Sequence, residues 1–347
     1  MRHPIIKAAA LAATVALAST ACGGSGGSDG RTVTFAAYGG DGQQAETDAW
    51  LDPFSEETGI EVVQDDPVTY AKIEQMVETG NVIWDVAQGG SDIGLTGNPI
   101  LEDIDCEVVA CEEFADGPFP AEQQGVPVFI FSVVLAYNTE KVSGTPTNWA
   151  DFFDTETHPG KRAIDSSVGF RGMLEAALLA DGVAREDLYP LDVDRALGYM
   201  EPLKDDLIAF EDATECINLV SSGEAVMGNC YNGRVTKAQE EGQPIDLAWG
   251  QQIYYCDYLF VPKGAPNKDE AMELIAHITS AENNGRIADH ISYGPANPGA
   301  EVSEESLANS PTSNQLEGED APIVPDDPWW LENREEVMET VSEWLAS

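Results

Sequence analysis

Residues 126–137 read VPVFIFSVVLAY, a stretch in which nearly every side chain is apolar. Valine, isoleucine and phenylalanine favour strands, and a continuous apolar run of this kind is typical of a strand that is buried on both faces. Most strands are only about five or six residues long. We therefore predict one unusually long strand, long enough to pass from one lobe of the protein into a second.

The sequence before this run alternates short strands with helices. Strands are predicted at 32–36, 60–63 and 84–87, and helices at about 43–58 and 70–80. A glycine stands at the end of each predicted helix, where a residue in the left-handed conformation is favoured. This β-α-β-α-β order predicts a sheet with helices on both faces.

A second unit of the same kind follows the run. Helices are expected near 149–153, 172–180, 192–204, 268–279 and 337–345, and strands near 161–165, 225–227 and 255–261. The segment 302–327 is polar and rich in proline, which predicts an exposed excursion. We assign 31–137 and 258–300 to lobe 1, and 138–257 and 301–347 to lobe 2. Two α/β lobes joined by crossing strands leave a cleft between them, where small ligands usually bind.

The first thirty residues predict export. Basic residues precede an apolar run at 8–18, which is too short to span a bilayer, since spanning takes about 20 residues. Small residues lead to Cys22, and a Gly/Ser-rich tether follows at 22–30. The pattern resembles a bacterial lipoprotein signal, although Ser19 stands where leucine is usual. The resemblance implies removal of 1–21 and a lipid anchor on Cys22 at the outer face of the cell membrane. Secretion without lipidation is the alternative.

Charge and cysteine content narrow the possible functions. The chain has 17 basic and 62 acidic residues, a net charge of −45, which excludes nucleic acid as a partner. Cys106 and Cys111 are close enough in sequence to form a local disulfide, whereas Cys216, Cys230 and Cys256 cannot all pair. There is no CxxC pair and the four histidines are scattered, so we expect neither a metal nor another cofactor.

Four segments carry a resemblance to a known family. They are PTNWADFF at 146–153 with PGKRA at 159–163, SGEAVMGNCYNGR at 222–234, YCDYLFVPKGAPNK at 255–268, and ISYGPAN at 291–297. Together and in this order they resemble the solute-binding proteins of ABC importers, most closely the spermidine/putrescine-binding branch. The resemblance implies a two-lobed α/β fold of the type II periplasmic-binding-protein kind. It also implies a monomer that delivers a small solute to a membrane permease and carries out no catalysis.

The same resemblance implies a set of ligand-binding residues. Four tyrosines stand where the family places aromatic residues against the ligand, Asp257 matches an ammonium-binding aspartate, and two residues lie in a loop that contacts the ligand in the family. For each tyrosine, packing in the wall of the cleft is the alternative role. With the acidic residue that ends the strand at 161–165, the predicted set is Tyr38, Ser91, Asp92, Asp165, Tyr231, Tyr255, Asp257 and Tyr293.

One departure from the family leaves the solute open. Polyamine-binding relatives place acidic residues after this strand, but here Asp165 is followed by Ser-Ser-Val-Gly at 166–169. A cationic, polyamine-like solute is our main expectation. The alternative is an amino-acid-like or other polar solute, whose carboxylate could meet Arg171. Two further classes are a secreted hydrolase and a surface adhesin or sensor. No nucleophile elbow, P-loop, dinucleotide fingerprint or HExxH motif supports an enzyme.

Overall fold

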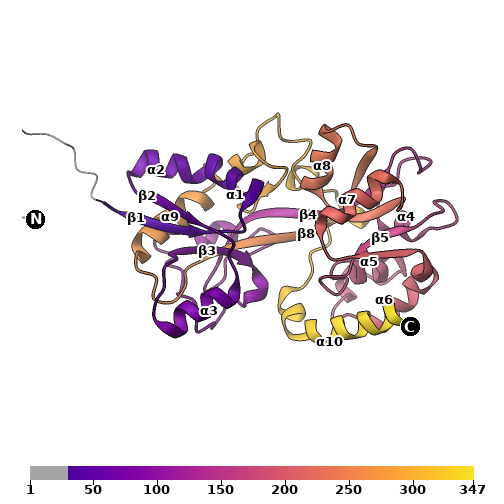
Figure 1. Cartoon of the computed structure of the whole chain (residues 1–347), viewed down its shortest axis with the longest axis horizontal. Coiled ribbons are helices and arrows are strands. Elements are labelled where there is room, and N and C mark those ends of the chain that lie inside the picture. Colours follow the sequence, from indigo (N-terminus) through magenta and orange to yellow (C-terminus); the bar gives the residue numbers. More distant parts are fainter. Residues whose placement is uncertain (1–29) are drawn as a thin grey trace, which may run out of the picture.

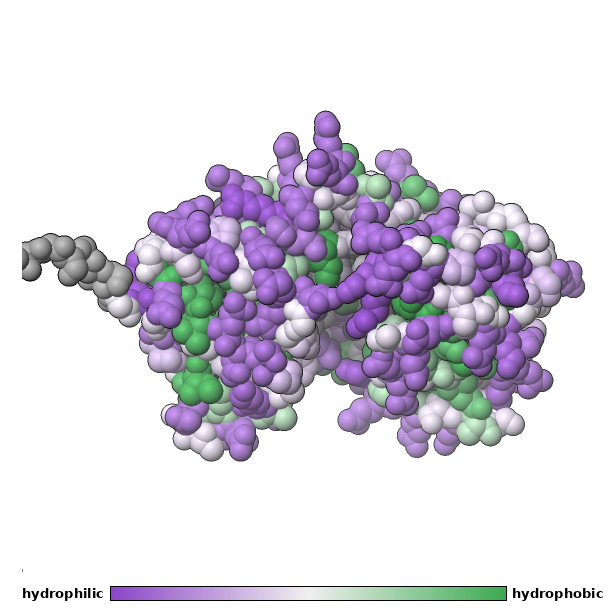
Figure 2. Space-filling model, turned by 45° about the horizontal axis from the view of Figure 1, so that its top comes forward, coloured by the Kyte–Doolittle hydropathy of each residue, from purple (hydrophilic) through white to green (hydrophobic). Residues whose placement is uncertain are grey.

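Residues 30–347 are described by a computed structural model. Two lobes lie side by side, and the long strands β4 (Val126–Asn138) and β8 (Ile245–Phe260) run from one lobe into the other (Figure 1). The surface is hollowed between the two lobes, and hydrophilic residues cover most of the face in view (Figure 2). The predicted two-lobed α/β fold is therefore confirmed, and the run at 126–137 is one crossing strand.

A single sheet of nine strands passes through both lobes in the order β2-β1-β3-β8-β4-β7-β5-β6, with β9 paired to β4. Strand β1 is parallel to β2 and β3, and β5 is parallel to β6 and β7. The crossing strands are antiparallel to each other and to their other partners. The remaining strands are β1 (Thr32–Ala36), β2 (Glu61–Asp65), β3 (Val86–Gly90), β5 (Arg162–Asp165), β6 (Leu207–Phe210), β7 (Met227–Tyr231) and β9 (Gly294–Pro295).

Helices pack on the faces of this sheet. The helix predicted at 43–58 is α1 (Gly40–Glu46), which continues through a π-helical turn (Thr47–Leu51) into α2 (Asp52–Thr58). The others are α3 (Tyr70–Thr79), α4 (Trp149–Phe153), α5 (Met173–Ala180), α6 (Val193–Met200), α7 (Ala213–Ser222), α8 (Asn232–Glu240), α9 (Lys268–Thr279) and α10 (Asp327–Ala346). A 3-10 turn, η2 (Ser91–Ile93), follows β3.

Two strands differ most from their predicted bounds, while β2 and β3 are displaced by only one to three residues. Strand β8 begins at Ile245, ten residues before the predicted 255–261, because its first half carries polar residues that hide the strand pattern. Pairing with β4 fixes this half in place, with Asn138 opposite Ile245. Strand β7 covers Met227–Tyr231 instead of 225–227. Its central Gly-Asn-Cys has low strand propensity, and pairing with β4 on one side and β5 on the other holds it in the sheet.

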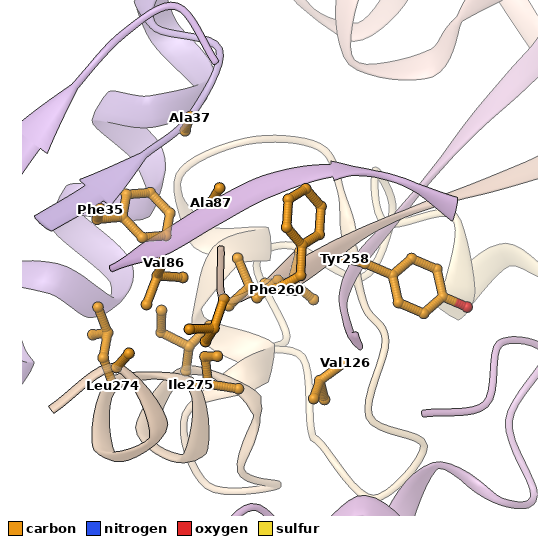
Figure 3. Packing of buried hydrophobic residues seen from close by; sticks show 14 of the residues in the cluster. Phe35, Ala37, Val86, Ala87, Val126, Tyr258, Phe260, Leu274 and Ile275 are labelled. Carbon is orange, nitrogen blue, oxygen red and sulfur yellow. The ribbon is translucent and has the colours of Figure 1, made fainter. Parts of the chain in front are cut away.

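Each lobe has its own buried core. In the first, Phe35 of β1, Val86 of β3 and Phe260 of β8 lie over Leu274 and Ile275 of α9 (Figure 3). Burying a side chain such as phenylalanine or leucine contributes about 1.5–3 kcal/mol, so this cluster fixes the edge of the sheet that carries the loops of the cleft.

The second core is built around α4 and α5 and is covered by α10. The closing helix predicted near 337–345 is confirmed, and its Trp330, Val337 and Val341 are buried in this core. Along β4 the buried side chains change from the first core to the second between Ile130 and Val133. The predicted division of the chain into lobes at 137/138, 257/258 and 300/301 remains a prediction.

The segment 302–327 is less exposed than predicted. Ile323 is buried and forms a bridge to Ile253 of β8. The carbonyl of Pro311 accepts hydrogen bonds from Nε2 of Gln252 (3.0 Å) and from the hydroxyl of Tyr254 (3.1 Å). Polar groups on β8 therefore form hydrogen bonds with this segment, and its local composition could not indicate this packing.

Disulfides join Cys106 to Cys111 and Cys216 to Cys230, and Cys256 is buried and unpaired. Cys22 and the predicted signal at 1–21 lie outside the described residues. None of the helices between residues 30 and 347 has the length and apolar character needed to cross a lipid bilayer. In the same range, no three acidic, histidine or cysteine side chains gather as a metal site would require.

Candidate ligand-binding site

A cavity of about 450 Å³ lies between the lobes. Lobe 1 contributes the loop after β1, the start of α3 and the turn after β3, and the crossing strands contribute one residue of β4 and two of β8. Lobe 2 contributes the loop before α5, the end of β7 and the start of α10. The polar and aromatic lining residues are Tyr38, Thr69, Tyr70, Ser91, Asp92, Phe131, Arg171, Tyr231, Tyr255, Asp257, Asp327, Trp330 and Arg334. A larger, more open cavity of about 1280 Å³ shares Tyr38, Phe131, Tyr231 and Asp257 with it and also borders Tyr293.

Aromatic rings form one wall of these cavities. Phe131 stacks on Tyr255 with ring centroids 5.7 Å apart, and Tyr231 and Tyr293 each lie 5.8 Å from Phe131. Phe129, two residues along β4, stacks on Tyr293 at 4.9 Å. Three of the four predicted tyrosines are thus brought together. The two phenylalanines were missed, although their spacing along β4 places them on one face of the strand.

The fourth predicted tyrosine stands apart from this wall. Tyr38 follows β1, is 53% exposed and borders both cavities, and its hydroxyl lies near the side chain of Tyr70. Burial of this hydroxyl, with the negative charges of Asp257 and Asp92 nearby, raises the pKa of Tyr38 above its ordinary value. Tyr38 is therefore a neutral hydroxyl at the edge of an anionic region.

Asp257 lies where the two cavities meet and is only 8% exposed. Its Oδ2 accepts a hydrogen bond of 2.7 Å from Nε2 of Gln88. Burial raises the pKa of Asp257 to about 6, with a further contribution from Asp92, while the Gln88 hydrogen bond opposes the rise. A buried carboxylate whose ionisation is costly is a strong partner for a cation that can enter the cavity.

Arg171 supplies a positive charge to the lining of the smaller cavity. Its Nη2 pairs with Asp327 at the start of α10, and its Nε is buried without a hydrogen-bond partner among the described residues. The guanidinium lies 5.2 Å from the ring of Tyr255, whose hydroxyl donates to the Arg171 carbonyl (2.8 Å).

The backbone on both sides of Arg171 is unusual. Phe170 has φ of 59° and Gly172 has φ of 83°, so the arginine is presented from a sharp turn at the start of α5. The Gly172 amide donates to the buried carboxylate of Glu175 (2.8 Å), which fixes this turn.

Ser91 and Asp92 lie at the edge of the smaller cavity and bond to the other lobe. The Ser91 hydroxyl donates to Asp327, and Asp92 pairs with Arg334 of α10 at 3.0 Å. Asp92 also accepts a hydrogen bond of 2.5 Å from Tyr70. These contacts close one side of the cleft, and no sequence motif indicated that Tyr70 or Arg334 belongs to the site.

Asp165 is placed differently from the other predicted residues. It ends β5, is buried, and borders neither cavity. Its Oδ1 accepts hydrogen bonds from the Ser167 amide (2.9 Å) and hydroxyl (2.6 Å), an arrangement that stabilises the turn after the strand. A direct role in ligand binding remains a prediction for this residue.

The fold and the cavity together define a two-lobed binding protein with aromatic, anionic and cationic groups in its cleft. The chain belongs to the family described as bacterial extracellular solute-binding protein, whose model matches residues 49–312. It is 32% identical over 330 residues to the gamma-aminobutyric acid-binding protein of Pseudomonas aeruginosa, covering 91% of each chain.

Two other similarities are informative. The spermidine/putrescine-binding periplasmic protein 1 of Haemophilus influenzae is 23% identical over 269 residues, with 72% of each chain covered. An ABC transporter substrate-binding protein from Bradyrhizobium japonicum has a solved structure that superimposes with a TM-score of 0.80 at 30% identity, covering 90% of this chain and 99% of that one. The expected resemblance to polyamine-binding proteins is therefore present, but it is weaker and shorter than that to the γ-aminobutyrate-binding protein.

Proposed function

We propose that this protein is the solute-binding component of an ABC-type importer and captures an amino-acid-like zwitterion with separated charges, such as γ-aminobutyrate. The carrying observation is that Asp257 and Arg171, which carry opposite charges, line one small cavity and each keep bonding capacity. The ligand would bridge the two lobes, so that binding stabilises their closure before delivery to a membrane permease.

The ammonium end of such a ligand fits the side of Asp257. A charge-assisted hydrogen bond contributes about 1.5–3 kcal/mol. Aromatic faces add to this, because an ammonium over a ring gains about 0.5–2 kcal/mol. The rings of Tyr231 and Phe131 border both cavities together with Asp257.

The carboxylate end fits Arg171. Its buried Nε lacks an acceptor, while Nη2 is occupied by Asp327, so the guanidinium keeps donor capacity for a second carboxylate. Arginine binds carboxylates through paired N–H groups in a fixed geometry. A buried donor without an acceptor costs about 1–3 kcal/mol, and a ligand carboxylate would remove this penalty.

A polyamine fits this arrangement less well. Its second ammonium would lie against Arg171 instead of against a carboxylate. The acidic residues that polyamine-binding relatives place after the strand are absent, and Asp165 is already bonded to Ser167.

Calorimetric titration of residues 30–347 with γ-aminobutyrate, butyrate, butylamine and putrescine tests the proposal. We expect γ-aminobutyrate to bind most tightly, and loss of either charged end to weaken binding about 10- to 150-fold, since each end contributes about 1.5–3 kcal/mol. Arg171→Met should weaken γ-aminobutyrate but not butylamine. Arg195→Met, which removes an arginine paired with Asp181 outside both cavities, is the matched control. Tighter binding of putrescine than of γ-aminobutyrate would contradict the proposal.

Export and anchoring are part of the same proposal. A lipid on Cys22 would hold the protein at the outer face of the membrane and close to its permease. Metabolic labelling with palmitate should mark the wild-type protein and leave Cys22→Ser unlabelled. If both proteins are released unlabelled into the medium, secretion without lipidation is the correct alternative.

A further inference from the structure

Two more buried polar residues border the larger cavity together with Asp257. Glu46, the last residue of α1, is 2% exposed, and Gln88 of β3 is 3% exposed. The Gln88 amide nitrogen donates to Asp257, and its side chain is also within hydrogen-bonding reach of the Glu46 carboxyl. The three side chains thus form a row, with a carboxyl group at each end and an amide in the middle.

This row contains two acceptors without donors. Oε2 of Glu46 and Oε1 of Gln88 are both buried and have no hydrogen-bond partner among the described residues. If Glu46 were ionised, both oxygens would stay unsatisfied, and two buried negative charges would share a single amide. A single proton on the Glu46 carboxyl supplies the missing donor and removes one of the charges.

The surroundings of Glu46 favour the neutral form. Burial raises the pKa of Glu46 well above its ordinary value, and the charge of Asp257 on β8 raises it further, with only the Gln88 hydrogen bond in opposition. Tyr293, beside β9, is the other titratable group facing it, and β3 contributes the uncharged Gln88. Between residues 30 and 347, Glu46 takes part in no ion pair.

We propose that Glu46 is a specificity-determining, positioning residue: as a neutral carboxylic acid it donates its proton to Oε1 of Gln88 and thereby holds the Gln88 amide on Asp257. The inference rests on the proposed function, in which Asp257 receives the ligand's ammonium. The ammonium subsite then carries one negative charge and suits one ammonium group. An ionised Glu46 would make the subsite doubly negative, which would favour ligands with a second cationic group.

Infrared spectroscopy tests the protonation directly, without any ligand. At pH 8, where Asp257 with its pKa of about 6 is ionised, the difference between wild type and Glu46→Gln should contain the C=O stretch of a protonated carboxylic acid. Glu61→Gln, at an exposed position of β2, is the matched control and should leave this band in place. Absence of the band from the wild-type protein would overturn the inference.

Titration with γ-aminobutyrate and putrescine tests the positioning role. Glutamine at position 46 still offers an N–H to Gln88, so Glu46→Gln should bind γ-aminobutyrate within about threefold of wild type. Glu46→Ala offers no donor and should bind about tenfold more weakly, the equivalent of one hydrogen bond. A tenfold or greater loss of γ-aminobutyrate affinity in Glu46→Gln would contradict the neutral form. So would a clear loss of putrescine affinity in Glu46→Gln, because it would show that putrescine binds to an ionised Glu46. If wild type binds no γ-aminobutyrate, the proposed function fails, while the infrared band still decides the state of Glu46.

Discussion

Because Asp257 is buried, its ionisation should make both the stability of the protein and its affinity for the ligand depend on pH. The carboxyl is 8% exposed, and its pKa rises from 3.8 to about 6. A difference of this size corresponds to about 3 kcal/mol between the two protonation states. Because the pKa is raised in the folded protein, the protonated acid is the favoured form. Its contribution to stability is complete below about pH 4 and is lost as pH rises through 6.

The perturbation is Asp257→Asn, with stability compared at pH 4 and pH 8 and binding measured from pH 5 to pH 8. At pH 8 the asparagine should increase the free energy of unfolding of the ligand-free protein by up to about 3 kcal/mol, because it removes a buried charge. The gain in stability will be smaller if the asparagine side chain accepts a weaker hydrogen bond from Gln88 than Asp257 does. At pH 4 the two proteins should be nearly equal in stability. Chemical denaturation of both proteins at the two pH values measures this difference.

Binding should show the opposite trend. With a pKa of about 6 for Asp257, only about a tenth of the wild-type molecules are ionised at pH 5, and nearly all are at pH 8. Neither charged group of γ-aminobutyrate titrates within this range. The wild-type affinity should therefore fall about tenfold from pH 8 to pH 5. Asp257→Asn should bind about 10- to 150-fold more weakly at pH 8, with a flat pH profile.

Calorimetric titration with γ-aminobutyrate at four pH values, on wild type and Asp257→Asn, measures both binding profiles. A wild-type profile as flat as that of the variant would show that Asp257 is not the ammonium partner. A variant that binds weakly and is also destabilised at pH 8 would refute the reasoning from burial, because it would assign the carboxylate a structural role.

Three further predictions concern the loops and strands around the site. Gly172→Ala should lower the free energy of unfolding by about 3 kcal/mol, because φ is 83° and a Cβ would lie 2.5 Å from a side chain of β8. The control Gly182→Ala, at φ of 85° with open space around it, should lower it by only about 1–2 kcal/mol, and equal losses in the two variants would show that the clash with β8 contributes nothing. Replacing Cys216 and Cys230 by alanine should cost about 3 kcal/mol, because the disulfide closes a loop of 14 residues, and an unchanged denaturation midpoint would show that it contributes nothing. Tyr255→Phe should weaken γ-aminobutyrate two- to tenfold, about one neutral hydrogen bond, by releasing the carbonyl next to the guanidinium; a hundredfold loss would mean that the hydroxyl contacts the ligand.

Local sequence patterns were sufficient where burial follows a simple period. The apolar run at 126–137 became β4 because its residues are buried along nearly the whole strand. The closing helix was found from Val337 and Val341, which repeat at helical spacing. The first half of β8 was missed, because its polar residues become strand-like only when paired with β4. Strand pairing is a long-range interaction that no local window contains.

The residues of the site were also predictable only in part. Motifs placed Asp257, Tyr231, Tyr255 and Tyr293 in the cleft, since these residues lie in segments that resemble the family. They could not indicate that Phe131 completes the aromatic wall, or that Arg334 of α10 pairs with Asp92, 242 positions earlier in the chain. Nor could they show that Asp165 is bonded to Ser167 instead of facing the cleft.

The sequence by itself determined the two-lobed α/β fold and the expectation of a solute-binding role, because apolar periodicity and family motifs are properties of short segments. Only the tertiary structure decided how the charges in the cleft are arranged. It placed Asp257 and Arg171 in the lining of one cavity and set Gln88 between Asp257 and a buried Glu46. The physical reason is that the energy of a charge depends on its burial and its partners, and in this protein the partners come from strands and helices far apart in the chain.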